Sequence, residues 1–296
     1  MRLVETRWQE SNQSTARYCL WEVDPGAYVE SSVLHMSGRD VESVVCLPSS
    51  VGCSAGCAMC AMPQSFSPRP LLQSEFDAIL SASLGYFRAE NGFQVSFMGQ
   101  GEPLLRPKGV FEFCNDLVRA YEGVLIGIST VGIPQGLRTL QRQPWMGSVK
   151  LQLSVHAWPS EKRLALVPAE RQYPLQESLR LAREFYRRSG QRVCLNVVLL
   201  EGVNDTLHDA KLIASLAQPR ETFYVKVSKY NPHDRAGFRA SSEHVTREYC
   251  EALRRQGAEF HVFESLGTSI GAGCGQTKIS VRSDLSATSR VNAKNP

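Results

Sequence analysis

The chain has 296 residues, of which 43% are hydrophobic and 21% are charged, and its formal net charge is +4. This is the composition of an ordinary globular protein, long enough for one large domain or two smaller ones. No apolar run approaches the roughly 18 residues that a membrane span requires, and the N-terminus lacks the apolar stretch of a secretory signal. We therefore expect a cytoplasmic protein without a membrane partner, and its nine cysteines suit a reducing compartment.

The first elements expected along the chain are short strands at residues 18–23 and 28–34, joined by a turn at Asp24-Pro25-Gly26. They predict a β-hairpin extension ahead of the main domain. Residues 1–12 are polar and show no periodicity, so we expect a tail there. The first predicted unit, residues 1–43, is this tail together with the β-extension.

From residue 44 onward, predicted strands and helices alternate. The strands are expected at 44–49, 95–98, 125–129, 149–155, 193–200, 223–227 and 260–263, and the helices at 74–89, 110–121, 136–142, 174–188, 206–217 and 243–256. Six or seven β-then-α units predict a parallel sheet covered by helices. A full eight-unit barrel takes about 250 residues, and roughly 220 carry the units here, so we expect an α/β fold with a partial (β/α)6 TIM-like barrel. The barrel and its last loop are predicted for residues 44–278, followed by a polar tail at 279–296.

Three cysteines, Cys53, Cys57 and Cys60, are spaced C-x3-C-x2-C directly after the first barrel strand. A structural zinc site closes its coordination sphere with four ligands, and a disulfide framework needs an even, dispersed set of cysteines. Three clustered thiolates instead fit a [4Fe–4S] cluster with one iron left open. The alternatives are inert buried cysteines or a zinc site completed from elsewhere in the chain.

Polar or glycine-rich residues follow several other predicted strands. Gly101 can let the backbone approach a ligand closely, and Glu102 can accept a hydrogen bond from an ammonium group. Ser129 ends the third barrel strand, Ser154-Val155-His156 ends the fourth, and Asn231 follows the sixth. Ligands of parallel αβ sheets bind at the carboxyl ends of the strands, where these residues and the three cysteines are expected to meet.

The cysteine spacing resembles the signature of the radical S-adenosylmethionine (SAM) superfamily. Seven further segments narrow the resemblance to the radical SAM adenine-C methyltransferases, the 23S rRNA/tRNA C2 enzymes and the related C8 resistance enzymes: 46–53, 99–104, 129–132, 153–157, 166–168, 202–205 and 272–276. The resemblance covers about residues 16–278. It implies that Cys53, Cys57 and Cys60 hold a [4Fe–4S] cluster whose open iron chelates SAM. It also implies that the SAM-binding residues are Gly101, Glu102, Ser129, Ser154, Val155, His156 and Asn231.

The resemblance also implies a mechanism with two further cysteines. One SAM methylates Cys274, and a second yields a 5′-deoxyadenosyl radical that takes hydrogen from the S-methyl group. The resulting carbon radical adds to C2 or C8 of adenine, a base removes the ring proton, and Cys46 attacks Cys274 to release the product as a disulfide. Glu30 is the candidate base, because 29–31 resembles the Val-Glu-Thr segment of the family. Glu42 lies in a second copy of that local pattern and remains an alternative.

The resemblance therefore predicts a monomeric methyltransferase that acts on an adenine carbon of rRNA or tRNA, with an electron donor such as flavodoxin or ferredoxin. Relatives of this type carry a helical N-terminal domain that engages RNA. Only about 15 residues precede the β-extension here, so we expect that domain to be absent. One alternative is therefore the same chemistry on a small nucleotide, nucleoside or other heteroaromatic molecule. Another is a non-catalytic paralogue that binds a cluster or RNA.

Overall fold

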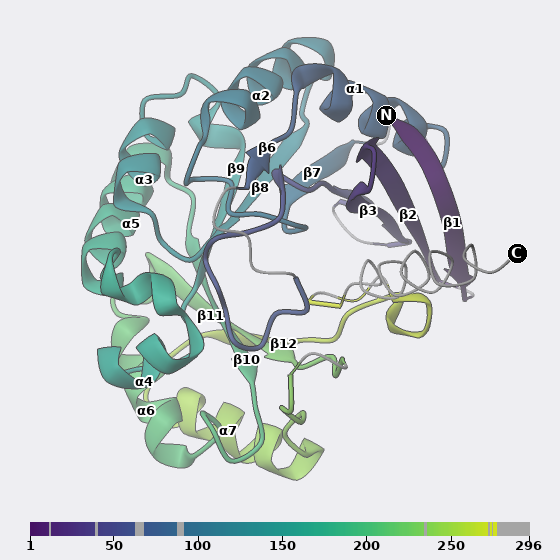
Figure 1. Ribbon diagram of the computed structural model, residues 1–296. Helices are drawn as coiled ribbons and strands as arrows, with labels where there is room; N and C mark the ends of the chain where they lie inside the picture. Colours follow the sequence, from purple (N-terminus) through teal and green to yellow (C-terminus); the bar gives the residue numbers. More distant parts are fainter. Residues whose placement is uncertain are drawn as a thin grey trace, which may run out of the picture.

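One ten-stranded sheet carries the fold in the computed structural model, which describes residues 1–11, 13–38, 41–62, 68–87, 92–233, 236–271, 273 and 275–276 (Figure 1). The strands follow the order β1-β2-β3-β4-β7-β8-β9-β10-β11-β12. Three of them form an antiparallel extension: β1 (Arg2–Glu10), β2 (Ser14–Asp24) and β3 (Ala27–Met36). The other seven are mutually parallel: β4 (Ser43–Cys46), β7 (Phe93–Phe97), β8 (Leu125–Thr130), β9 (Val149–Ser154), β10 (Val193–Leu199), β11 (Phe223–Lys229) and β12 (Phe260–Phe263). A two-stranded ribbon, β5 (Ser50–Val51) with β6 (Arg69–Pro70), lies beside them.

Helices connect the parallel strands and cover the convex side of the sheet, as Figure 1 shows. They are α1 (Gln73–Leu84), α2 (Lys108–Ala120), α3 (Pro134–Leu140), α4 (Ser160–Leu166), α5 (Leu175–Ser189), α6 (Leu207–Leu216) and α7 (Glu243–Arg255). Each parallel strand from β4 to β11 is followed by at least one helix, which confirms the six predicted β/α units. The ordered sheet runs from β1 to β12 without a β1–β12 pairing, so the barrel is partial, as expected.

The sheet separates an apolar layer from a polar one, because strand side chains alternate between its two faces. On β10, Leu195 and Val197 are fully buried among the helices, whereas Asn196 faces the concave side. The concave side is therefore polar along several strands, which suits a ligand site.

Besides the short β5–β6 ribbon, strand β1 and helix α4 differ from the sequence-based expectations. Residues 2–10 form strand β1, which pairs along β2, where a tail was predicted; its side chains are mostly charged or half-exposed, so no apolar alternation marked it. Helix α4 was not predicted either, because seven residues give too short a periodic pattern. The predicted hairpin is confirmed by the antiparallel pairing of β2 with β3.

The segment after β12 crosses the open side of the sheet toward the extension (Figure 1). There the hydroxyl of Ser269 donates a hydrogen bond to the Gln9 side chain of β1 at 2.7 Å. Residues far apart in the sequence thus meet where this segment reaches the extension.

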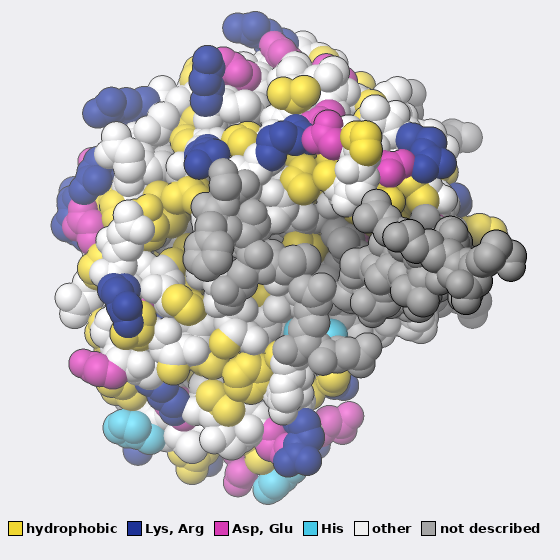
Figure 2. Space-filling view, viewed as in Figure 1, with side chains coloured by type: hydrophobic (Ala, Val, Ile, Leu, Met, Phe, Trp, Pro, Cys, Tyr) yellow, Lys and Arg dark blue, Asp and Glu magenta, His cyan; other side chains and the backbone are white. Residues whose placement is uncertain are grey.

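The charged side chains of the helical periphery are mixed in sign, as Figure 2 shows for one face of the molecule. The ion pair of Arg138 with Glu177 joins α3 to α5, and Arg180 pairs with the same Glu177 within α5. No helix within the described ranges has both the length and the apolar composition needed to cross a membrane.

Candidate active site

A cavity of about 200 Å³ opens at the carboxyl ends of the parallel strands. The structure brings nine of the predicted ligand-binding residues to its wall: Cys53, Cys57, Cys60, Gly101, Glu102, Ser129, Ser154, His156 and Asn231. Val155 is fully buried and its side chain does not line the cavity. The role of Val155 in SAM binding therefore stays a prediction.

The loop that carries the three cysteines is held by backbone hydrogen bonds to distant segments. The Ala58 N–H donates to the carbonyl of Leu166 at the end of α4 (2.9 Å), and the Ala61 N–H donates to the carbonyl of Gly275 (3.2 Å). Between them, the His233 ring contacts the Met59 carbonyl through Nε2 at 3.0 Å. The cysteine loop is thus fixed against α4, the segment after β11 and the C-terminal loop.

The donor set of this loop fits a [4Fe–4S] cluster. Within the described residues, no three His, Cys, Asp or Glu side chains converge as they would around a single metal ion. In a cluster each thiolate binds a different iron, so three sulfurs spread around one cavity are the arrangement required. Backbone N–H groups of Ala55 and Gly101 donate toward the Cys53 sulfur and lower its pKa, but burial dominates and raises that pKa to about 11.

Glu102 lies where backbone groups orient its carboxylate into the cavity. Its two oxygens accept hydrogen bonds from the N–H groups of Leu104 (3.0 Å) and Val131 (2.8 Å). Burial raises the pKa of Glu102 to about 6 in spite of these bonds. The preceding residue must be glycine, because a Cβ on Gly101 would lie 2.3 Å from the hydroxyls of Ser49 and Ser50 and its φ is +101°.

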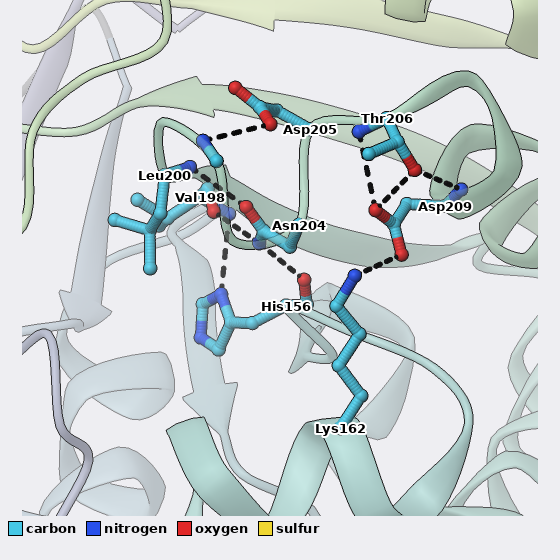
Figure 3. Close-up of polar contacts among 9 residues, drawn as sticks. His156, Lys162, Val198, Leu200, Asn204, Asp205, Thr206 and Asp209 are labelled. Carbon is cyan, nitrogen blue, oxygen red and sulfur yellow. Dashed lines mark hydrogen bonds and ion pairs between the residues drawn. The ribbon is translucent and has the colours of Figure 1, made fainter.

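His156 is held by the loop after β10, as Figure 3 shows. The amide of Asn204 donates to the carbonyls of His156 (2.6 Å) and Val198 (2.9 Å) and accepts from the N–H of Leu200 (2.8 Å). The Val198 N–H donates to Nδ1 of the His156 ring at 3.2 Å, which leaves the ring proton on Nε2. Burial, with a smaller effect of the Arg163 charge, lowers the pKa of His156 to about 3, so the ring is neutral at physiological pH. The motif 202–205, noticed in the sequence, thus supports a histidine 48 residues away.

Arg163 of α4 joins the ends of strands β8 and β9 through hydrogen bonds. Its guanidinium is fully buried, pairs with Glu170, and donates to the carbonyls of Val131 (2.7 Å), Ser154 (3.0 Å) and Val155 (3.2 Å). These carbonyls follow or end β8 and β9. Arg163 therefore fixes the spacing between the end of β8, which carries Ser129, and the loop after β9, which carries His156.

A second cavity, of about 160 Å³, adjoins the first between the β-extension and the C-terminal loop. Glu30 and Cys46 line it together with Gly273 and Gly275, and Cys60 and Gly275 line both cavities. Cys274 itself lies outside the described residues. Glu42 does not line this cavity; its carboxylate accepts the N–H of Gly38 at 2.8 Å.

Sequence reasoning missed several polar residues on the wall of the first cavity, among them Gln152, Asn196, Lys226 and Ser228. They occupy alternate positions of β9, β10 and β11, between apolar residues that face the helices. This alternation was visible in the sequence, but ligand contacts were predicted only at the strand ends and in the loops that follow them.

The open parallel barrel and the three-cysteine loop define a radical SAM enzyme, and the family model of the radical SAM superfamily matches residues 47–216. A radical SAM methyltransferase from Sphaerobacter thermophilus has a similar solved structure, with a TM-score of 0.82 and 26% identity over 94% of this chain and 81% of that one. SuiB from Streptococcus suis, solved with S-adenosylmethionine, shares the fold at a TM-score of 0.52 and 12% identity over 77% of this chain and 48% of that chain.

Two relatives carry the name "probable dual-specificity RNA methyltransferase RlmN". The protein from Thermotoga neapolitana is 32% identical over 94% of this chain and 80% of its own length, and that from Moorella thermoacetica is 34% identical over 86% and 73%. The chain therefore belongs to the radical SAM superfamily and, within it, to the RlmN methyltransferase family. It is a radical SAM methyltransferase whose cofactors are a [4Fe–4S] cluster and SAM, which confirms the predicted class and cofactors.

Proposed function

We propose that this protein methylates C2 or C8 of an adenine in rRNA or tRNA, with Cys274 as the methyl carrier. The names of the RlmN relatives support RNA as the substrate. Adenine C2 and C8 are electron-poor carbons between two nitrogens, so they do not attack the methyl group of SAM directly and require radical chemistry.

The observation that carries this proposal is the second cavity. Glu30 from β3 and Cys46 from the end of β4 face the glycines on either side of Cys274, beside the cysteine loop. Methyl transfer through a thioether requires three groups at one place: a carboxylate, a thiol and a cysteine loop flanked by glycines. Glu42, in the same local sequence pattern, lies elsewhere.

When bound, the cluster and SAM supply a methyl group and a carbon-centred radical. In our proposal the Cys274 sulfur carries the transferred carbon as a thioether and holds it toward the adenine ring. Glu30 accepts the proton from the ring carbon that gains the new bond. The unpaired electron of the adduct would leave to the bound cluster. The Cys46 thiolate then attacks the Cys274 sulfur, so that the S–S bond forms as the C–S bond breaks, and the electron pair of the broken bond takes up a proton to complete the methyl group of the product.

The proposal includes a cytoplasmic location, a monomer in solution and a flavodoxin or ferredoxin as electron donor. The reducing compartment suits a chemistry that must reopen the Cys46–Cys274 disulfide in each turnover.

The experiment is methylation by anaerobically reconstituted protein with SAM and a chemical reductant, using rRNA, tRNA or free adenosine nucleotides as acceptors. The products are digested to nucleosides and analysed by mass spectrometry. We expect a methylated adenine from RNA only. Methylation of the free nucleotides alone would assign a small-molecule substrate, and the absence of SAM cleavage with every acceptor would contradict an enzymatic role.

The Cys46→Ala variant tests the release step. It should accumulate a covalent RNA adduct on Cys274, visible as a shifted band on a denaturing gel, because no thiol remains to attack the thioether. Cys250→Ala, which removes a buried thiol on α7 far from this cavity, is the matched control and should turn over normally. A fully active, adduct-free Cys46→Ala protein would remove Cys46 from the mechanism.

A further inference from the structure

A buried lysine lies on the concave wall of the first cavity. Lys226, in the middle of β11, is 9% exposed, and its neighbours across the sheet are Asn196 of β10 and His261 of β12. Its ammonium group contacts Oε1 of Gln152 at 3.3 Å and lies 3.8 Å from the centre of the Phe263 ring. Neither partner carries a negative charge.

An ammonium group removed from water is stable only when lone pairs or negative charges replace its hydration. Lys226 forms no ion pair with any carboxylate of the described residues, and its contact with Gln152 is long for a hydrogen bond. Its remaining donors have the cavity as their surroundings. The lysine is therefore set up to donate hydrogen bonds to a ligand.

The partner Gln152 connects this lysine to a residue already assigned to the site. Its Nε2 donates to the hydroxyl of Ser129 at 2.8 Å, while its Oε1 accepts from Lys226. Because the Ser129 oxygen accepts this bond, its own proton is directed to another acceptor. Lys226, Gln152 and Ser129 thus form a connected row of donors along the cavity wall.

The positions of Lys226, Gln152 and Ser129 on the cavity wall indicate which end of SAM they face. The cysteine loop and Glu102 hold the methionyl end of SAM in our assignment, and they belong to segments following β4 and β7. Lys226 and Gln152 belong to the interior of β11 and β9, on the other side of the same cavity. The adenosyl end carries purine nitrogens and ribose hydroxyls, which are uncharged acceptors of hydrogen bonds.

We propose that Lys226 is a specificity-determining residue that donates a hydrogen bond to the adenosyl moiety of SAM, supported by Gln152. This inference depends on SAM occupying the first cavity and does not depend on the identity of the methyl acceptor. It is therefore tested without RNA.

The test is equilibrium binding of S-adenosylhomocysteine and of methionine to cluster-loaded protein, by calorimetry under anaerobic conditions. Lys226→Met keeps the aliphatic volume and removes the donor. We expect S-adenosylhomocysteine to bind about 10-fold to 100-fold more weakly, the range for a lost hydrogen bond from a charged group, and methionine to bind unchanged. Lys150→Met is the matched control, because Lys150 is exposed on β9 and contacts Gln191.

A set of ligand analogues then identifies the acceptor atom. Wild-type protein is titrated with S-adenosylhomocysteine analogues that lack N1, N3, N7 or one ribose hydroxyl. For the analogue that lacks the atom bound by Lys226, the wild-type and Lys226→Met proteins should have equal affinities. If every analogue keeps the full difference between the two proteins, the direct contact is contradicted.

Thermal unfolding without ligand separates a binding role from a structural one. If Lys226 serves a ligand, its contacts with Gln152 and Phe263 compensate only part of the cost of burying the charge, so Lys226→Met leaves the melting temperature equal or higher. A marked fall in melting temperature, or equal losses of affinity for S-adenosylhomocysteine and methionine, would assign Lys226 to the support of the fold. An affinity for S-adenosylhomocysteine within twofold of wild type would also overturn the proposal, whether or not RNA is methylated.

Discussion

At the scale of single residues, the site depends on residues whose backbone conformation or ionisation state is determined by their surroundings. His156 has a φ of +61°, the only positive value among the non-glycine residues that the structure describes. Such a conformation costs about 1–3 kcal/mol and persists only where neighbouring groups enforce it. The bonds to Asn204 provide that enforcement and keep the ring on the cavity wall.

The neutral state of His156 predicts a loss of stability in acid. The pKa of His156 is about 3 in the folded protein and its ordinary value is 6.5, so between these values the unfolded chain binds the proton and the folded chain does not. Stability from this group is complete above pH 6.5 and is lost progressively as the pH falls toward 3, about 2 kcal/mol of it by pH 5. Urea unfolding from pH 7.5 to 5 measures this slope. His156→Gln should flatten it, whereas His244→Gln, on the exposed side of α7, should not; an unchanged slope in His156→Gln would refute the assignment.

Gly101 predicts a steric effect confined to the site. In Gly101→Ala the new methyl group meets the Ser49 and Ser50 hydroxyls and the left-handed backbone becomes strained, so we expect a loss of about 1–3 kcal/mol. Gly147→Ala is the control, since a Cβ there meets no atom within 4 Å, and it should change stability by about 0.5 kcal/mol or less. Denaturant unfolding of both variants measures these losses of stability. Equal losses would show that the close approach at Gly101 does not contribute to the free energy of unfolding.

At the scale of elements, strand ends are positioned by groups from the helices that follow them. Arg163 and Glu170 come after β9, yet they bond to the ends of β8 and β9 and to the N–H of Leu175 at the start of α5 (3.0 Å). Replacing only one residue of an ion pair with this many hydrogen bonds lowers stability strongly, because the charge of the other residue stays buried.

Arg163→Met should therefore destabilise the protein by roughly 3–5 kcal/mol and weaken SAM binding. The double variant Arg163→Met with Glu170→Gln should recover part of the stability, because no uncompensated carboxylate remains. A thermodynamic cycle from chemical unfolding of the single and double variants measures the coupling. Additive effects of the two substitutions would show that the pair does not act as a unit.

At the scale of the whole molecule, segments from the two ends of the chain meet over the open sheet and enclose the site. The extension β1–β3 and the segment after β12 meet through Ser269 and Gln9, and the second cavity lies between them. Glu30 and Cys46 on one side and Gly273 on the other are brought together only by this closure.

Strand β1 is thus predicted to protect the sheet as well as to anchor the C-terminal segment. Removal of residues 1–11 exposes the edge of β2, a template for pairing with another chain. We expect a lower urea midpoint and concentration-dependent association in size-exclusion chromatography. Trp8→Ala, which trims a 63% exposed side chain and keeps the strand, is the control and should remain monodisperse. A stable, monodisperse truncated protein would contradict this role of β1.

Features that are local in the chain could be predicted from the amino-acid sequence. The cysteine loop carries all three predicted cluster ligands within eight residues, and the strand–helix alternation from residue 44 sufficed for the parallel sheet and its six units. The sequence did not predict β1, because the charged residues of this segment hide the alternation of polar and apolar side chains. This segment is a strand because it pairs with β2.

Features that depend on long-range packing could not be predicted from the sequence and are seen in the folded protein. Glu30 and Glu42 share one local pattern, and the course of β3 alone places Glu30 at the second cavity. Lys226 and Gln152 are 74 residues apart and meet because β9, β10 and β11 are neighbours in the sheet. Ligand spacing within one loop is fixed by covalent geometry, whereas contacts between strands are fixed by the register of the sheet, which no local pattern encodes.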